Sequence, residues 1–222
     1  YRVFRETVNG QVQGGVTKVP FPALTSSALR ARFNPADGQL FIGGLRGWQT
    51  NGGTGFQRIR FVSDEKPVPL KLEAFKNGLR VEFSSSLDPE IAKDPRRYSI
   101  SKWDYIWGPQ YGSGRFSIDE QDAAARELAR AEPSKGSVNQ VDSVEIRAAQ
   151  LLEDGKSVFL YIPKMTPAMQ MEIRMDLADE ELLDRWSEGF RTQEFTNMFI
   201  DNGFADAKGK LLPVVKKELL LL

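Results

Sequence analysis

The stretch 98–113 carries the densest group of side chains that could recognise a ligand. Its sequence, YSISKWDYIWGPQYGS, holds two of the chain's 4 tryptophans and three of its 5 tyrosines. Large rings at this density either anchor a β core or form an exposed surface on which flat apolar ligand faces, such as those of sugars, can stack. The candidate ligand-binding residues are therefore four rings: Trp103, Tyr105, Trp107 and Tyr111.

Three of these rings alternate along the chain, at positions 103, 105 and 107. Alternate side chains of a regular strand point to the same side, so the three rings would share one face. A shared face fits burial in a core, sugar stacking and a protein–protein surface alike. The strands expected on both sides of the stretch favour a core anchor, and a binding role belongs to whichever ring the fold leaves uncovered.

A second pair of candidates, Arg46 and Trp48, lies in the glycine-containing sequence LRGW. A guanidinium group packed on an indole ring is a favourable contact. We expect this pair to pack at the junction between two β regions, because the sequence identifies no polar partners that a ligand site would need.

The chain has few residues suited to catalysis or metal binding. It has 0 histidines and 0 cysteines, which excludes thiol nucleophiles, histidine-based triads, thiolate zinc sites and haem attached through Cys-x-x-Cys-His. Asp88, Glu90 and Asp94 are close in the sequence, but they lack the spacing of a calcium-binding EF-hand loop. Asp88 and Asp94 each precede a proline, which is typical of turns. The sequence thus predicts no metal and no cofactor; it leaves enzymatic activity open but favours a chain without its own catalytic site.

Length and charge place the chain among ordinary globular proteins of one or two domains. It has 222 residues, of which 30 are basic and 30 are acidic. This balance leaves no overall positive field, so we expect no nucleic-acid partner. No run approaches the roughly 18 apolar residues of a membrane-spanning helix, so we expect no membrane span.

The first part of the chain, residues 1–62, is expected to form short antiparallel strands. The sequence NPADG at 34–38 is a strong turn, because proline fixes φ and glycine supplies positive φ. Four or five short strands resemble a single propeller blade, but they are too few for a closed propeller. The expected strands cover residues 1–8, 14–21, 28–33, 39–42 and 56–62.

The polar, proline-rich sequence SDEKPVP at 63–69 predicts a linker. After it, apolar and polar residues alternate over longer runs, and Asn77-Gly78 predicts a hairpin while Asp154-Gly155 predicts a turn. The clearest run predicts one dry face and one wet face, the dry face consisting of Met169, Met171, Ile173, Met175 and Leu177. About six such strands predict a β-sandwich over residues 70–178.

Two segments depart from the β pattern. Residues 119–131 are rich in Ala, Glu and Arg, and Ser117 with Glu120 has capping-box spacing, so a short helix is expected there. Residues 180–187, which are followed by a glycine, predict a second short helix in the C-terminal extension 179–222. One last strand is expected at 195–200.

Two blocks of the sequence resemble a known protein family. Residues 30–48 (RARFNPADGQLFIGGLRGW) look like the last blade of large secreted β-propeller proteins related to glucose/sorbosone dehydrogenases, of planctomycete and verrucomicrobial type. Residues 79–177 resemble the immunoglobulin-like module that follows the propeller in those proteins. The most specific part of this second block is DPRRYSISKWDYIW with the later YGS.

The resemblance implies an all-β architecture: an antiparallel immunoglobulin-like sandwich at 70–178, preceded by a blade-like segment at 1–62 and the linker 63–69, with one or two short inserted helices. It also implies a non-catalytic scaffold or docking module of a secreted or periplasmic propeller protein or redox assembly, with other protein domains or subunits as partners. The propeller would lie upstream of Tyr1. Two alternatives are a carbohydrate-binding module that uses exposed rings, and a fragment of a quinone-dependent sugar dehydrogenase.

Overall fold

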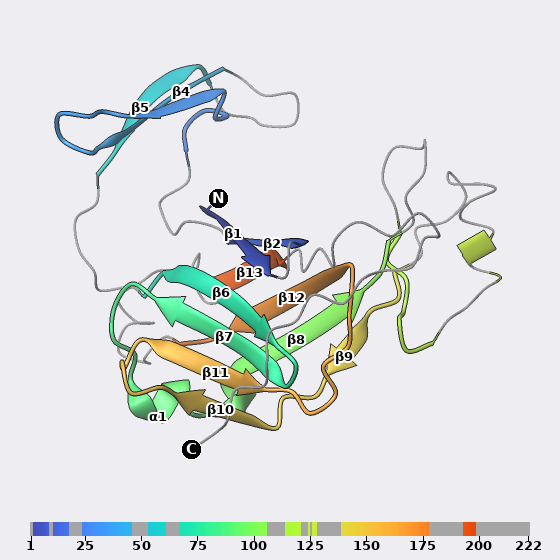
Figure 1. Ribbon diagram of the computed structural model, residues 1–222. Coiled ribbons are helices and arrows are strands. Elements are labelled where there is room, and N and C mark those ends of the chain that lie inside the picture. Colours follow the sequence, from blue (N-terminus) through green and yellow to red (C-terminus); the bar gives the residue numbers. More distant parts are fainter. Residues whose placement is uncertain are drawn as a thin grey trace. The chain divides into compact units, whose positions relative to one another are not determined.

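Strands dominate the described part of the chain, which holds 13 strands, one α-helix and one 3₁₀ helix (Figure 1). The expected all-β fold class is confirmed. The chain divides into two compact units, residues 1–18 with 67–222 and residues 19–66. The computed structural model describes residues 2–8, 11–17, 24–45, 53–60, 67–105, 114–120, 124, 126–127, 139–177 and 193–198.

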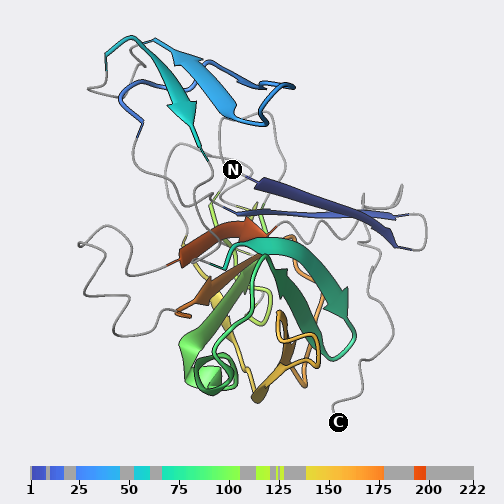
Figure 2. The same ribbon diagram turned by 90° about the vertical axis from the view of Figure 1, so that its left-hand side faces the viewer.

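Two four-stranded antiparallel sheets form two layers of the larger unit (Figures 1 and 2). The first sheet has the order β10-β11-β7-β6 and consists of β6 (Pro69–Phe75), β7 (Gly78–Phe83), β10 (Ala148–Leu151) and β11 (Ser157–Tyr161). The second has the order β13-β12-β8-β9 and consists of β8 (Tyr98–Trp103), β9 (Asp142–Val144), β12 (Gln170–Met175) and β13 (Gln193–Met198). β13 corresponds to the last strand expected at 195–200.

The inward faces of the two sheets share one apolar core. Met171, Ile173 and Met175 are 1–2% exposed, which confirms the dry face predicted for 169–177. Full burial of a side chain of this size contributes about 1.5–3 kcal/mol, so this shared face is the main source of the sandwich's stability. The core includes side chains of both sheets: Ala74, Leu79, Val81, Phe83, Tyr98, Ile100, Val158, Leu160, Met171, Ile173 and Met175.

The strand order of the two sheets can be compared with that of immunoglobulin-type sandwiches. In immunoglobulin-type sandwiches one sheet contains strands A, B, E and D, and the other contains G, F and C, often with C′. Lettering the strands from β6 as A to β13 as G gives the orders D-E-B-A and G-F-C-C′. The strand order therefore favours the immunoglobulin-like assignment.

Both predicted turns join neighbouring strands of the first sheet. Asn77 ends the short turn between β6 and β7, and Gly78 is the first residue of β7. Gly155 has φ +65° in the turn between β10 and β11, where Asp154 Oδ1 accepts the N–H groups of Lys156 at 2.9 Å and Ser157 at 2.7 Å. A left-handed φ suits glycine, because it lacks Cβ.

Asp88 and Asp94 each cap a short helix. α1 (Pro89–Ala92) begins after Asp88, whose Oδ1 accepts a backbone N–H of the first turn at 2.7 Å. The 3₁₀ helix Pro95–Arg97 begins after Asp94, whose Oδ1 accepts a backbone N–H at 3.0 Å. These two carboxylates therefore act in local turns, as the Asp-Pro pairs predict.

The face of β12 opposite the core is only partly wet. Arg174 is exposed, whereas Glu172 is 6% exposed and its carboxylate lies 3.3 Å from Arg174 Nη2. The structure differs here from the fully wet face predicted for 169–177. β12 is an inner strand, so its outward side chains are flanked by those of strands on both sides.

A hairpin near the N-terminus belongs to the larger unit. β1 (Arg2–Val8) pairs antiparallel with β2 (Gln11–Thr17), and β2 contacts β13 of the sandwich. The expected segment 1–62 joins this hairpin to the strands beyond residue 28, whereas the compact units separate the two. A strand pattern predicts that a hairpin forms, but it does not predict which sheet the hairpin packs against.

The smaller unit contains one antiparallel sheet. The predicted turn at 34–38 joins its first two strands, with Gly38 at φ +67° and Asn34 Oδ1 accepting a backbone N–H at 3.2 Å. Four or five short strands were expected over residues 1–62, and the described residues of this unit form three strands. In order across the sheet these strands are β3 (Arg30–Phe33), β4 (Leu40–Gly44) and β5 (Gly55–Ile59).

Of the predicted helix at 119–131 the structure describes residues 119 and 120, which form a bend, and residues 124, 126 and 127, which are helical. Ser117 Oγ accepts the Glu120 N–H at 2.7 Å, as the capping-box spacing predicts. Outside the described residues lie most of the linker 63–69 and the whole of the predicted helix 180–187.

Candidate functional site

Trp103 is buried, but on the outer face of the second sheet rather than in the core between the sheets. The alternate residues Tyr98 and Ile100 are the core members of β8. Trp103 is 2% exposed, its Nε1 donates to Gln170 Oε1 at 2.7 Å, and the Arg115 guanidinium lies 4.4 Å from its ring centroid. A ring covered to this extent offers no free face to a sugar, so Trp103 leaves the set of candidate ligand-binding residues.

The other predicted site residues are described only in part. Tyr105 is half-buried and lies beyond the end of β8, so the alternation argument does not extend to it. The roles predicted for the remaining four stay predictions, since these residues lie outside the described part of the chain: Trp107, Tyr111, Arg46 and Trp48.

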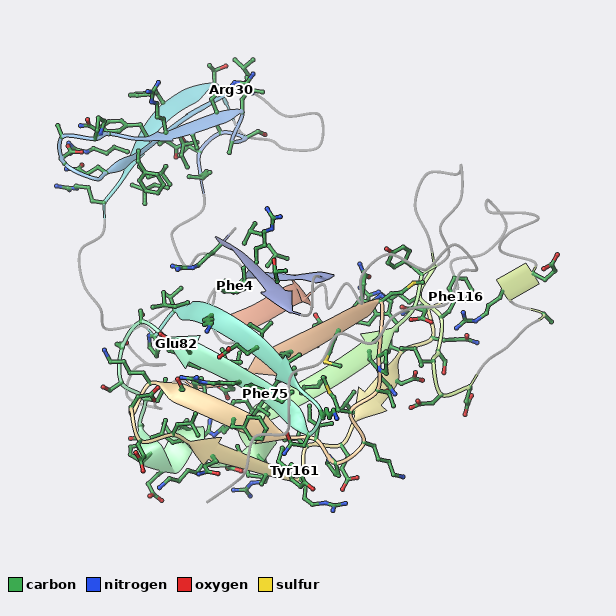
Figure 3. All side chains as sticks on the ribbon, in the orientation of Figure 1. Phe4, Arg30, Phe75, Glu82, Phe116 and Tyr161 are labelled. Atoms are coloured by element: carbon green, nitrogen blue, oxygen red, sulfur yellow. The ribbon has the colours of Figure 1, made fainter. Side chains whose placement is uncertain are left out.

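β8 ends where the chain begins its long connection to β9. Asp104 forms an isolated antiparallel bridge with Phe116 (labelled in Figure 3), with backbone N–O distances of 2.9 Å in both directions. The Asp104 carboxylate accepts the Met169 N–H at 3.1 Å and lies 3.7 Å from Arg126 Nη2. These contacts tie the connection, residues 104–141, to the end of the sandwich.

Lys102 is a buried cation at this end of the sandwich. The residue is 5% exposed, and its Nζ donates to Asp119 Oδ1 at 2.7 Å and to Thr166 Oγ1 at 2.8 Å. Burying an ammonium group without partners costs several kcal/mol, so both acceptors are needed. Because Asp119 belongs to the long connection and Lys102 to β8, the ion pair holds the connection against the sandwich.

Asp142 lies directly opposite Lys102 in the pairing of β9 with β8. Its carboxylate accepts hydrogen bonds from Ser117 Oγ at 2.6 Å and from the N–H groups of Ile118 at 2.6 Å and Asp119 at 3.1 Å. Partial burial by itself would raise the pKa of Asp142, but these hydrogen bonds and the charge of Lys102 hold that pKa below its ordinary value. The carboxylate therefore stays ionised and acts as an acceptor rather than as a proton donor.

The lowered pKa of Asp142 predicts acid-dependent stability. Its ionised form stabilises the native state above the unfolded-state pKa of about 4, and this contribution is lost as the pH falls through the lower folded-state pKa. We expect Asp142→Asn to lower the free energy of unfolding at pH 7 and to approach the unmodified chain as the pH falls below about 4. Urea unfolding across this range measures the difference, and an equal loss at neutral and acid pH would show that the charge is not involved.

A second polar network lies on the outer face of the first sheet. Arg80 lies 3.4 Å from Glu73 and 3.5 Å from Asp154, and its Nη2 donates to Ser157 Oγ at 3.1 Å. Partial burial alone would raise the pKa of Asp154, but hydrogen bonds from Ser157 and Lys156 and the charge of Arg80 lower it. The network joins β6, β7 and β11 to the turn before β11, so its role is structural.

A small cavity lies between the N-terminal hairpin and the sandwich. Its volume is about 10 Å³, and seven apolar residues line it, including Phe4 and Val16 of the hairpin and Ile173 and Met175 of β12. This volume holds about one water-sized sphere, which is too little for a substrate. The cavity is therefore a packing defect rather than a substrate site.

Comparison with protein-family models, with curated proteins and with solved structures finds no match to this chain. In the part of the chain that the structure describes, no helix has the length and apolar character needed to cross a membrane. The function therefore has to be argued from the contacts and charges of the described residues.

Proposed function

We propose that this chain is a non-catalytic scaffold or docking module built on an immunoglobulin-like β-sandwich. The main support for the proposal is that the buried charged side chains of the sandwich form structural ion pairs. Lys102, Glu73 and Glu172 are 5–6% exposed, and each is held in an ion pair. Lys102 pairs with the long connection and Glu73 with the neighbouring strand β7, whereas Glu172 pairs with Arg174 of its own strand. A catalytic site needs charged groups that face a substrate pocket, whereas these charged groups are engaged in structural ion pairs.

Two further observations support the proposal. The strand orders D-E-B-A and G-F-C-C′ match those of immunoglobulin-type sandwiches. The resemblance of residues 30–48 and 79–177 to secreted propeller proteins supports a place after a propeller, in a secreted or periplasmic protein. Other domains or subunits of that protein or redox assembly are then the partners of this module.

An activity assay tests the non-catalytic part of the proposal. The purified chain is mixed with a quinone cofactor, an electron-accepting dye and a series of aldose sugars. We expect no dye reduction above that of the quinone alone, because the buried charges of the sandwich are held in structural contacts. Dye reduction that saturates with sugar and disappears when the chain is heat-denatured would overturn the proposal and favour a dehydrogenase fragment.

A further inference from the structure

One face of the β3–β5 sheet gathers arginines around two phenylalanines. In the register of the sheet, Phe41 on β4 lies between Arg32 on β3 and Arg58 on β5. The next cross-strand row adds Arg30 (labelled in Figure 3) and Phe56. Residues directly opposite one another on neighbouring strands share a face. These five residues therefore form one surface, the arginine–phenylalanine face.

The two rings of this face form one continuous apolar surface. The ring centroids of Phe41 and Phe56 lie 5.6 Å apart with an angle of 22° between the ring planes, so the rings are stacked. Gly43 lies opposite Phe56, and a Cβ added at this position would make an ordinary contact of 3.8 Å with Phe56 Cδ2. Phe56 is 76% exposed. Phe41 is half-buried, so the Phe56 ring forms most of the exposed part of this surface. Exposed apolar patches often mark interaction sites.

Residues 25 and 26 cover part of the opposite face of the same sheet, whereas Phe33 on that face is 66% exposed. Gln57 Nε2 donates to Ser26 Oγ at 3.1 Å, and Gln57 Oε1 accepts the Thr25 N–H at 2.9 Å. Ile42, which shares that face, is 3% exposed. On the arginine–phenylalanine face the three arginines and Phe56 are exposed.

The arginines of this face have no acidic partner among the described residues. Within the described residues, Arg32 and Arg58 make no ion pair, and Arg30 Nη1 donates to a neighbouring backbone carbonyl at 3.2 Å. Arg60 is exposed at the next alternate position after Arg58, so it extends the same side. Against these four arginines, residues 24–45 and 53–60 contain a single acidic residue, Asp37. A chain of zero net charge therefore carries a local surface that attracts anions.

We infer that the arginine–phenylalanine face binds an acidic polysaccharide whose sugar rings carry carboxylates. The apolar C–H faces of a sugar ring can stack on exposed aromatic rings, and the guanidinium fork matches a carboxylate through two parallel hydrogen bonds. Arginines on both sides of Phe41 place cations where a stacked sugar holds its carboxylates. This activity goes beyond the proposed docking role, and it assigns carbohydrate binding to the β3–β5 sheet instead of the rings that follow β8.

The size of the face favours a polysaccharide over a protein partner. Three strands about 4.8 Å apart, with about five residues of 3.4 Å each, give a face of roughly 14 by 17 Å, or about 240 Å². A standard protein–protein interface buries about 800 Å² on each partner, so this face is too small for one. The balance of 30 basic and 30 acidic residues also removes the long-range field on which binding to many phosphates of a nucleic acid depends.

Affinity electrophoresis of the full chain tests the inference. The chain is run through native gels that contain polygalacturonate, a polymer with one carboxylate per sugar, or dextran, a neutral one. We expect retardation that grows with the polygalacturonate concentration, and none with dextran. Phe56→Ala, which removes the exposed ring, and the double variant Arg32→Gln/Arg58→Gln, which removes two charges, are each expected to weaken the apparent affinity about five-fold.

Phe33→Ala is the matched control, because Phe33 is 66% exposed but lies on the opposite face of the same sheet. It is expected to leave the retardation unchanged, and equal urea midpoints of the variants confirm that each is folded. Competition with polyglutamate and with oligothymidylate separates the other partner classes. Tighter binding of polyglutamate would indicate an acidic protein partner and tighter binding of oligothymidylate a nucleic acid, and either result overturns the inference. Absence of retardation by polygalacturonate, or an unchanged affinity of Phe56→Ala, does so as well.

Discussion

Replacing Trp103 by alanine is expected to lower the free energy of unfolding by about 3–5 kcal/mol. The ring is 2% exposed, so its removal leaves a large cavity between the second sheet and the residues that cover it. It also leaves Gln170 Oε1 without the indole N–H, and Arg115 without the ring on which it packs. Urea unfolding of the full chain, followed by far-UV circular dichroism, measures the loss.

Two substitutions serve as controls for this prediction. Trp103→Phe keeps an aromatic ring but removes the hydrogen bond to Gln170, so a smaller loss of about 1–2 kcal/mol is expected. Phe56→Ala removes a ring that is 76% exposed, and its effect on stability is expected to stay within about 0.5 kcal/mol. A loss below about 1 kcal/mol for Trp103→Ala would contradict the burial of this ring.

Replacing Gly78 by alanine is expected to lower the free energy of unfolding by about 3 kcal/mol. The main reason is steric, because β11 passes close to Gly78 on the neighbouring strand, and the Gly78 φ of +158° is also one that L residues rarely adopt. An added Cβ would clash with the backbone carbonyl oxygen of Leu160 and would lie 2.7 Å from Phe159 Cζ. The Leu160 carbonyl is part of the sheet and cannot move without disturbing its hydrogen bonds, whereas a side chain alone could turn away.

Gly155→Ala is the matched control for the steric prediction. Gly155 has a left-handed φ of +65°, but nothing lies within 4 Å of a Cβ added there. Its replacement therefore costs only the backbone strain of an L residue in this conformation, about 1–2 kcal/mol. Urea unfolding of both variants separates the two causes, and equal losses would show that the approach of β11 to Gly78 has no steric consequence.

The features that could be predicted from the sequence are those that depend only on residues close together in the chain. The alternation at 169–177 predicts the buried face of β12, because the two faces of a strand have different surroundings. Asn77-Gly78 and Asp154-Gly155 predict turns, since the conformations needed there suit these residue types. The capping role of Ser117 follows from the same kind of local rule.

The contacts of the candidate sites depend on residues that are distant in the sequence. Lys102 continues the alternating set of Tyr98 and Ile100, and a charge at that position was the available signal that the apolar face of β8 ends there. Its partner Asp119 comes from the long connection, and Asp142 comes from the next strand, so only the fold shows the cluster. Neither acid is among the predicted site residues.

The sequence also does not predict which side chains of the aromatic stretch and of the arginine–phenylalanine face are exposed. Equal spacing of rings does not predict whether other segments cover them, and at Trp103 residue Arg115 packs on the ring. Arg32, Phe41 and Arg58 are well separated in the sequence, and only the register of the sheet places them in one row. The zero net charge of the whole chain conceals this local surface.

The mass of the native protein tests the central proposal, that this chain is a module of a larger secreted or periplasmic protein. The protein is isolated from the extracellular and periplasmic fractions of the cells that produce it, and intact-mass spectrometry is combined with peptide mapping. We predict a polypeptide well above the 25.0 kDa of these 222 residues, with peptides of this sequence mapped within it. A native protein of 25.0 kDa that begins at Tyr1 and consists of these residues alone would contradict the claim.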